Sequence, residues 1–525
     1  MQSKLFSFSK NNHVYVLFLL LLLIDRVILL TNFNFKYVGS DDLIFWQAAT
    51  DYMHGKFYEP YFYGQNYNFM LESFFAIPFI KIGIPYFYAF PICSSIIALF
   101  PFIFTSFVLK KNGYFIESLC FLILPVLLPI EYGILTSVTR GFISGLFFNS
   151  FLIISLLSPS KKTSWFIAAF SISIGFIFNP NSLVFSFPIC LYMFLINWNK
   201  FTFYIINILI IIPVLSIQYF AKKFYENNQE FNVNGMQKIT FKVEKIFDNF
   251  QHLDQFFNYF TPILWFSGWL IIFIIFFLSI YIINKDLKKG LSLLFGVIFI
   301  IFTLGINKVN DHIDSIFLSS TRMFLGIPLF TGLAFFWIRE YVVFTDRQIK
   351  LIFVNVAFTV FFVKASILPT VTKFHTTITN YGSVAIKKSK ELVCDCNKLN
   401  SIADKYNATL FAFVPAWNIN VPHMEFYNYG CPLLIKKFPN TVMNIYEKRT
   451  WVYLKEKTKI EKNILIYGSD IITKTNEIKQ NKNLKDIDIE VISKNPTIII
   501  IKNNKIRLDS LFKKLMIDFK RNAYS

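Results

Sequence analysis

The stretch VYVLFLLLLLIDRVILL, at Val14–Leu30, decides the class of fold. A helix of about 17–25 mostly apolar residues spans the hydrocarbon core of a bilayer, and this stretch reaches that length. It ends in TNFNF at residues 31–35, and no small-residue cleavage site follows. We therefore interpret it as an uncleaved first transmembrane helix rather than a signal peptide. Asp25 and Arg26 lie within it, towards its outer end, where we expect paired or snorkelling charges.

The composition of the whole chain agrees with a polytopic membrane protein. Of the 525 residues, 54% are hydrophobic and 16% are charged, and Phe alone occurs 66 times. Apolar segments of spanning length recur along the chain, and about 11 of them are candidate transmembrane helices. They are Val14–Leu30, Pro85–Leu109, Phe115–Ile130, Gly141–Leu157, Trp165–Phe178, Leu183–Ile196, Phe201–Phe220, Ile263–Ile283, Leu291–Ile306, Met323–Ile338 and Leu351–Leu368. The fifth and sixth are short and separated by Asn179-Pro180-Asn181, so they are two spans with a tight outer turn or one long broken helix.

Basic residues in the short loops predict the orientation of these helices, because short loops rich in Lys and Arg stay in the cytoplasm. They all fall on one side: Lys110, Lys111, Lys161, Lys162, Lys200, Lys285, Lys288, Lys289, Arg339, Arg347 and Lys350. The outer side then holds the loops Val38–Glu72, Ala221–Pro262 and Asn307–Thr321 and the chain after Pro369. The loop Ala221–Pro262 also carries lysines, but the rule weakens with loop length. We expect an integral protein of a bacterial plasma membrane.

The composition changes after Pro369, where apolar runs shrink to strand length and Lys and Asn become common. LNSIADKYNATLFAFVP reads as a helix followed by a strand, and KNILIYG, DIEVIS and PTIIIIKNN read as further strands. We therefore expect an α-helical polytopic membrane protein with a small soluble α/β domain on its outer face. The transmembrane domain is placed at 1–369, with a first outer loop at 31–84, and the C-terminal domain at 370–525. The linker Thr370–Ser389 is a candidate membrane-surface helix.

Three cysteines lie in this C-terminal domain. Cys394 and Cys396 form a Cys-x-Cys pair, and Cys431 is distant in sequence, which gives too few ligands to indicate a zinc site. In an oxidising compartment a disulfide between Cys431 and one member of the pair is the alternative.

The net charge of +20 does not indicate nucleic acid as a partner, because topology and attraction to anionic headgroups explain it. The sequence contains no nucleic-acid motif, no P-loop and no Gly-rich dinucleotide turn. We expect membrane lipids among the partners of the chain and no nucleic acid.

The first outer loop, VGSDDLIFWQAATDYMHGKFYEPYFYGQNYNFMLE at 38–72, keeps two acids side by side. Asp41 and Asp42 follow Gly39-Ser40 at the start of an expected interfacial helix, where Ser or Asp can cap and carboxylates are favoured by the helix dipole. A paired carboxylate can also serve as a general base, because each charge raises the pKa of the other. The two interpretations are compatible, since a capped helix fixes a carboxylate in place.

This loop resembles the first outer loop of the GT-C-type membrane glycosyltransferases, in particular the protein O-mannosyltransferase and aminoarabinose-transferase-like group. The resemblance rests on Asp41-Asp42, on GKFYEP at 55–60, on GQNY at 64–67 and on Glu72. It covers about Lys36 to Leu368, and the tail after Pro369 resembles no family that we can name. It implies transfer of a sugar from a polyprenyl-phosphate donor to a glycan, lipid or protein acceptor on the outer face, with inversion.

The resemblance also implies roles for individual residues. Asp41 matches the leading acid of the group and would be the base, with Asp42 beside it. Glu72 resembles an acid that helps a divalent metal or the carrier phosphate in some relatives; a helix-terminal acid is the alternative. Candidate substrate-binding residues in the same loop are Tyr63, Gln65, Tyr67 and His54.

Two arginines at outer ends of spans are candidates for binding the donor phosphate. Arg140 lies in SVTRGFISG and Arg322 in SSTRMFLGIP, where no positive-inside rule explains them. Negative charge develops on the leaving phosphate, and the planar fork of Arg suits it. Interfacial anchoring is the alternative for both. Asp311, His312 and Asp314 could contribute to a metal or acceptor site.

Two other functions use lipid-linked sugars. A flippase or transporter would need charged residues inside its spans, facing a cavity, whereas this chain keeps its span interiors almost free of charge. A polymerase or ligase of lipid-linked glycans would place its chemistry in a large late loop. The acids of the first loop therefore favour a glycosyltransferase, with these two functions as alternatives.

Overall fold

The computed structural model describes residues 8–231, 239–265, 267–309, 322–342, 345–380, 386–414, 442–444, 458–468, 488–494 and 497–514. The chain divides into two compact units. Unit 1 comprises Met1–Asn34, Pro91–Tyr219 and Lys238–Ser383. Unit 2 comprises Phe35–Phe90, Phe220–Gln237 and Val384–Ser525.

The predicted spans coincide with helices of the structure. They are α1 (Phe8–Leu29), α4 (Tyr86–Lys111), α5 (Phe115–Leu127), α7 (Ser144–Asn149), α8 (Leu152–Leu157), α9 (Lys162–Phe178), α10 (Leu183–Asn197), α11 (Phe201–Asn227), α14 (Trp269–Ile283), α15 (Leu287–Thr303), α17 (Ile327–Ile338) and α18 (Asp346–Asn380). Within the described residues, 5 helices are long and apolar enough to cross a membrane by length and composition, and further helices are apolar but shorter. The prediction of an integral, mostly helical membrane protein is confirmed.

Three details of the predicted spans differ. The fifth and sixth are two helices, α9 and α10, which pack on each other and are joined by the 3-10 turn η3 (Pro180–Ser182). The fourth starts later than predicted, at Ser144, and a turn at Ser150–Phe151 divides it into two short helices, α7 and α8. Helix α18 continues to Asn380 and so takes up the first half of the predicted linker.

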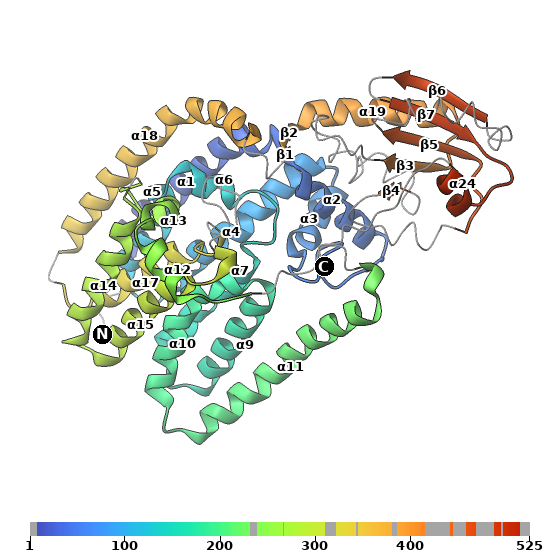
Figure 1. Cartoon of the computed structure of the whole chain (residues 1–525). Coiled ribbons are helices and arrows are strands. Elements are labelled where there is room, and N and C mark those ends of the chain that lie inside the picture. The colour runs from blue at the N-terminus through green and yellow to red at the C-terminus, as the bar shows by residue number, and fades with distance from the viewer. Residues whose placement is uncertain are drawn as a thin grey trace. The chain divides into compact units, whose positions relative to one another are not determined.

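Helix packing in unit 1 places α14 against α15, α10 against α15 and α9 against α7 and α8 (Figure 1). The contact between α7 and α9 depends on two glycines. A Cβ on Gly145 would lie 2.6 Å from the carbonyl oxygen of Gly175, so only small residues allow the two backbones to approach. Helices α1, α5 and α18 share a core that includes Phe18, Leu122 and Ala357.

Short elements connect these helices in unit 1. They are η2 (Leu30–Asn34), α6 (Ile130–Leu135), α12 (Val243–Phe250), α13 (Leu253–Phe257), η5 (Asn258–Phe260) and η6 (Asn307–Val309). Helix α6 and the residues after it lead into the segment that carries Arg140, and η2 follows directly on the first span.

Unit 2 contains a five-stranded sheet, and the C-terminal sequence predicted four of its strands. Its strands are β3 (Leu410–Val414), β4 (Val442–Asn444), β5 (Asn463–Gly468), β6 (Asp488–Lys494) and β7 (Thr497–Lys502). Their order is β4-β3-β5-β7-β6, with β3 parallel to β4 and β5, and β7 antiparallel to β5 and β6. Helices α19 (Ser389–Lys405) and α24 (Leu508–Lys514) belong to the same unit (Figure 1). Cys396 of α19 is disulfide-bonded and Cys394 is free, while Cys431 lies outside the described residues.

The first outer loop belongs to the same unit as this sheet. It forms helices α2 (Ser40–Met53) and α3 (Leu71–Lys81), which pack on each other. The apolar core beneath α24 combines strand residues such as Ile464 and Ile499 with Tyr61 of the loop and Tyr225 at the end of α11. Strand β1 (Tyr37–Gly39) also pairs with β2 (Ile386–Lys388) in antiparallel register.

Candidate active site

The predicted acidic pair opens helix α2, with different surroundings for its two members. Gly39 is the N-cap, in an extended conformation, and its N–H donates to Asp42 Oδ2 at 2.7 Å. Asp42 is buried, whereas Asp41 is partly exposed. The carboxylate of Asp42 therefore satisfies a backbone donor at the positive end of the helix, as a capping acid does. The cap expected from Ser or Asp at the N-cap position itself is provided instead by Asp42 reaching back to Gly39.

A third aspartate of α2 was missed by sequence reasoning. Asp51, near the helix end, is buried and accepts a hydrogen bond from the hydroxyl of Tyr63 at 2.9 Å. Tyr63, a predicted substrate-binding residue, is itself fully buried. Burial raises the pKa of the Tyr52 phenol, and the carboxylates of Asp51 and Glu59 raise it further. The loop thus holds buried carboxylates beyond the adjacent pair.

Glu59 organises the GQNY segment. Its Oε2 accepts from the N–H of Gly64 at 3.0 Å and from the hydroxyl of Tyr225 at 3.3 Å. Gly64 has a φ of 79°, which favours glycine at this turn. Gln65 then donates its backbone N–H to Phe62 at 2.8 Å. The Gly-Gln pair is therefore a turn closed on a buried carboxylate.

The remaining predicted residues of the loop are spread over its surface and its interior. Gln65 and Tyr67 are partly buried, and His54 is exposed at the end of α2, with Nδ1 2.7 Å from the carbonyl oxygen of Thr50. Glu72 is fully buried in the first turn of α3, where a carboxylate also suits the helix dipole. Its predicted role and the helix-terminal alternative both stay open.

Arg140 lies in a buried, non-helical segment of unit 1 at 136–143. Gly141 has a φ of 71° there, so the backbone turns directly after the arginine. Irregular backbone inside a membrane protein must find its hydrogen bonds in the protein, and it is tolerated only where it is buried or lines a cavity. Such a segment carrying an arginine is a functional candidate.

Polar side chains from three other elements fix this segment. Arg26 of α1 donates to Thr136 Oγ1 at 3.2 Å, and Ser137 donates to Asn34 Oδ1 at 2.8 Å. The hydroxyls of Thr139 and of Ser94 in α4 lie 3.2 Å apart. Every one of these side chains is buried. Thr136, Ser137 and Thr139, which make these contacts, directly precede Arg140, so the contacts constrain the backbone that leads to it.

Asn179 and Asn181 hold the same segment on the other side of Arg140. Asn179 Nδ2 donates to the carbonyl of Gly141 at 3.2 Å, and Asn181 Nδ2 donates to the carbonyl of Phe142 at 2.9 Å. Asn181 Nδ2 also donates to the carbonyl of Arg322 at 2.9 Å. The Asn-Pro-Asn break, which the sequence showed only as an interruption, is thus a joint between two distant segments.

Arg322 is placed against the Arg140 segment by a second contact. Its guanidinium carbon lies 4.4 Å from the ring centroid of Phe142, a cation–π distance. Phe142 follows Arg140 by two residues. The structure therefore brings together the two segments that carry the predicted phosphate-binding arginines, although they are far apart in sequence. The predicted acids belong to unit 2 and the arginines to unit 1.

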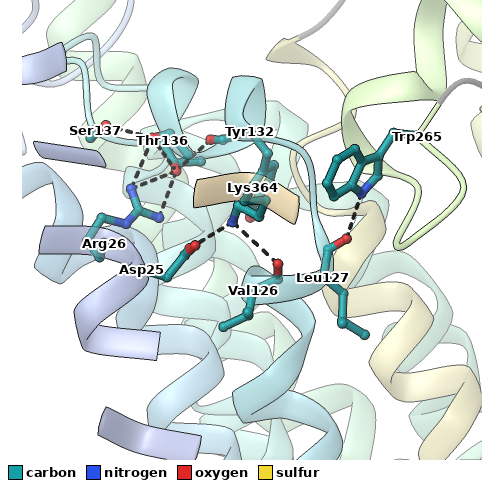
Figure 2. A network of polar contacts seen from close by, with 10 residues as sticks. Asp25, Arg26, Val126, Leu127, Tyr132, Thr136, Ser137, Trp265 and Lys364 are labelled. Atoms are coloured by element: carbon teal, nitrogen blue, oxygen red, sulfur yellow. Dashed lines mark hydrogen bonds and ion pairs between the residues drawn. The ribbon is translucent and has the colours of Figure 1, made fainter. Parts of the chain in front are cut away.

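A further charged residue lies inside a span, beyond Asp25 and Arg26, and the sequence analysis overlooked it. Lys364 of α18 is buried and donates to Asp25 Oδ2 at 2.8 Å and to the carbonyl of Val126 at 3.3 Å (Figure 2). The neighbouring Arg26 donates to the carbonyl of Gly133 at 3.0 Å. The expectation of a paired charge is confirmed for Asp25, whereas Arg26 is buried and binds a carbonyl and a hydroxyl instead of an acid. The statement that span interiors are almost free of charge was too broad.

Metal binding by the chain stays a prediction. Within the residues that the structure describes, no group of three or more His, Cys, Asp or Glu side chains is placed to hold a metal ion. The candidate residues Asp311, His312 and Asp314 lie outside the described residues.

Comparisons with known proteins place the fold. No protein-family model matches the sequence, and no curated protein matches it. The crystal structure of ArnT from Cupriavidus metallidurans in the apo state is similar, with a TM-score of 0.51 and 9% identity over 94% of this chain and 98% of that chain. A crystal structure of ArnT from the same organism bound to undecaprenyl phosphate has a TM-score of 0.49 and 8% identity over 92% and 97%. The likeness to the apo structure shows a GT-C-type fold, as the resemblance of the first loop implied.

Proposed function

We propose that this chain is a membrane glycosyltransferase that moves a sugar from a polyprenyl-phosphate donor to an acceptor on the outer face of the membrane. The observation that carries the proposal is the joint at Asn181, which holds the Arg140 segment and Arg322 together. Two arginines on buried, fixed backbone suit a phosphate that gains charge. The GT-C-type fold and the acidic first loop support the same conclusion.

The arginines would act on the leaving group. The bond between the anomeric carbon and the phosphate oxygen breaks, and the polyprenyl phosphate leaves with the electron pair. A guanidinium offers two parallel N–H donors to the phosphate oxygens, so Arg140 and Arg322 would neutralise that charge as it develops. Lysine could supply the charge but not the fork.

The acids of the first loop would act on the acceptor. Asp41 would take the proton of the acceptor hydroxyl while the oxygen attacks the anomeric carbon. A single displacement of this kind inverts the configuration at that carbon. Asp42 accepts the N–H of Gly39 as a capping acid does, and Asp41 matches the leading acid of the group, so Asp41 is the candidate for the base. Glu72, Gln65 and the divalent metal keep the roles that the resemblance implies.

A transporter of lipid-linked sugars is the second candidate, because Lys364 and Asp25 are charged groups inside spans. The two are paired at 2.8 Å, and Lys364 also bonds a backbone carbonyl. Paired groups of this kind join helices, and they do not favour a path for a substrate over the transferase proposal.

Mass spectrometry of surface glycans from a deletion strain tests the proposal. A transferase predicts the loss of one sugar from otherwise complete glycans, restored by the intact chain and not by Arg322→Ala. Arg347→Ala is the matched control, since Arg347 is an exposed arginine at the start of α18 and should restore the sugar. Loss of entire glycans would favour a transporter or a polymerase. If the Arg322→Ala variant restores the sugar fully, Arg322 does not bind the donor phosphate.

A further inference from the structure

Arg26 is a buried cation of the first span whose guanidinium faces the segment leading to Arg140. Nη1 donates to the carbonyl of Gly133 at 3.0 Å, and both Nη1 and Nη2 lie 3.2 Å from Thr136 Oγ1 (Figure 2). Thr136 Oγ1 donates in turn to the carbonyl of Tyr132 at 2.8 Å. The guanidinium thus binds the C-terminal end of α6 and the first residue of the non-helical segment together.

The position of this contact gives it a consequence for Arg140. Helix α6 ends at Leu135, and the chain stays non-helical up to Ser144. A buried carbonyl at a helix end needs a hydrogen-bond donor, and the carbonyl of Gly133 has Arg26 Nη1 at 3.0 Å beside the hydroxyls of Ser137 at 2.6 Å and Thr136 at 3.3 Å. Arg26 is the donor among these that comes from a different helix, so its loss would release the end of α6 from α1, and a shift there would pass to Arg140 through four residues of irregular backbone.

Asp25, the residue of α1 next to Arg26, is also charged but contacts a different part of the molecule. Successive residues of a helix point in different directions, so Asp25 and Arg26 contact different elements. Asp25 pairs with Lys364 of α18 at 2.8 Å, and Arg26 reaches the end of α6 (Figure 2). The ion pair joins α1 to α18 and touches no residue between Thr136 and Arg140 among the contacts described here.

We propose that Arg26 is a positioning residue for the donor site, which holds the segment at 136–143 so that Arg140 meets the phosphate of the donor. This rests on the proposed function, because it assumes that Arg140 binds phosphate. Arg26 itself does not touch the donor. The neighbouring pair of Asp25 and Lys364 serves stability and provides an internal control one residue away.

The test measures binding of undecaprenyl phosphate to the detergent-solubilised full chain, by titration of its tryptophan fluorescence. Arg140→Ala should weaken the affinity about tenfold, and Arg26→Met by a similar factor, the size of effect seen between residues of one network. The double variant should bind no worse than Arg140→Ala alone, because Arg26 has nothing left to position. Arg26→Lys should recover part of the loss, since an ammonium can keep one of the two partners.

Two further variants separate positioning from loss of fold. Thr136→Val removes the acceptor of the same contact while keeping the shape of the side chain, and it should weaken binding in the same direction as Arg26→Met. If Arg26→Met does not fold, the affinity of Thr136→Val tests the positioning role in its place. Lys364→Met breaks the adjacent ion pair and should lower the unfolding temperature while changing the affinity by less than about twofold.

Several outcomes would overturn the inference. Unchanged affinity in Arg26→Met and Thr136→Val, with a loss in Arg140→Ala, removes the positioning role and leaves the phosphate site intact. If the loss of affinity in the double variant equals the product of the losses in the two single variants, Arg26 acts on binding independently of Arg140. Unchanged affinity in Arg140→Ala is a different failure, since it removes the proposed phosphate site and the inference with it.

Discussion

Replacing the two adjacent aspartates singly by asparagine should separate a catalytic role from a capping role. Asp42 Oδ2 accepts the N–H of Gly39 at 2.7 Å, and an asparagine oxygen can accept the same bond. Asp42→Asn therefore loses mainly the charge at the helix N-terminus, worth about 0.3–1 kcal/mol. A folded domain has about 5–15 kcal/mol of stability, so the amount of folded protein should hardly change.

Asp41→Asn should instead lower the rate of sugar transfer. A general base contributes about 100- to 10,000-fold, which at 1.36 kcal/mol for each tenfold is about 2.7–5.4 kcal/mol of activation free energy. Asparagine keeps the size of Asp41 and cannot take a proton at neutral pH. The loss of rate from Asp41→Asn should therefore exceed that from Asp42→Asn by at least about tenfold, with equal protein levels.

The assay follows polyprenyl phosphate released from a polyprenyl-phosphate sugar in membranes, with the protein quantified in the same samples. Dividing the rate by the measured amount of protein corrects for reduced expression of either variant. Near-normal turnover in both variants would mean that the pair only caps α2. A larger loss in Asp42→Asn than in Asp41→Asn would mean that its bond to Gly39 is not its main role, and the assignment of the base would be reversed.

Three further predictions concern other parts of the molecule. Arg322→Lys should recover only part of the transfer activity lost in Arg322→Ala, because lysine lacks the fork; equal activity of the lysine variant and the intact chain in the release assay would contradict a bidentate contact. Lys364→Met should lower the free energy of unfolding by about 3–5 kcal/mol, since it leaves Asp25 without its cation, and adding Asp25→Leu should recover most of this in thermal unfolding. If the second change gives no recovery, the pair does not act as a unit. A cysteine at Asn66 should react with an impermeant maleimide only from outside the cell, and reaction only from the cytoplasm would reverse the orientation.

The sequence predicted the elements of this fold well where local composition determines them. Span positions follow from apolar length, and strands such as β5 and β7 follow from short apolar runs between polar turns. The prediction of a paired charge in the first span is confirmed for Asp25. The acid pair at Asp41 was found because its spacing after that span is a local feature.

Contacts between distant residues were beyond such reasoning. Lys364 is one lysine in an apolar run, and its partner Asp25 lies 339 residues earlier. Asn181 was visible as part of a helix break, but nothing local indicates that it holds Phe142 and Arg322. The burial of Asp51 depends on Tyr63, which lies beyond an irregular stretch of chain. These contacts depend on tertiary packing, which no window of sequence contains.

The pairing of β1 with β2 has a consequence for how the protein is made. Tyr37 lies opposite Lys388, 351 residues later (388 − 37), and β1 leads directly into the helix that carries the acid pair. At about 5–20 residues per second, a ribosome takes roughly 20–70 s to add that length. A growing chain therefore contains Asp41 and Asp42 long before β2 is synthesised, and β1, directly before these acids, has no partner strand until then. An incomplete chain can therefore already be in the bilayer while the strand pairing next to its acidic loop is still missing.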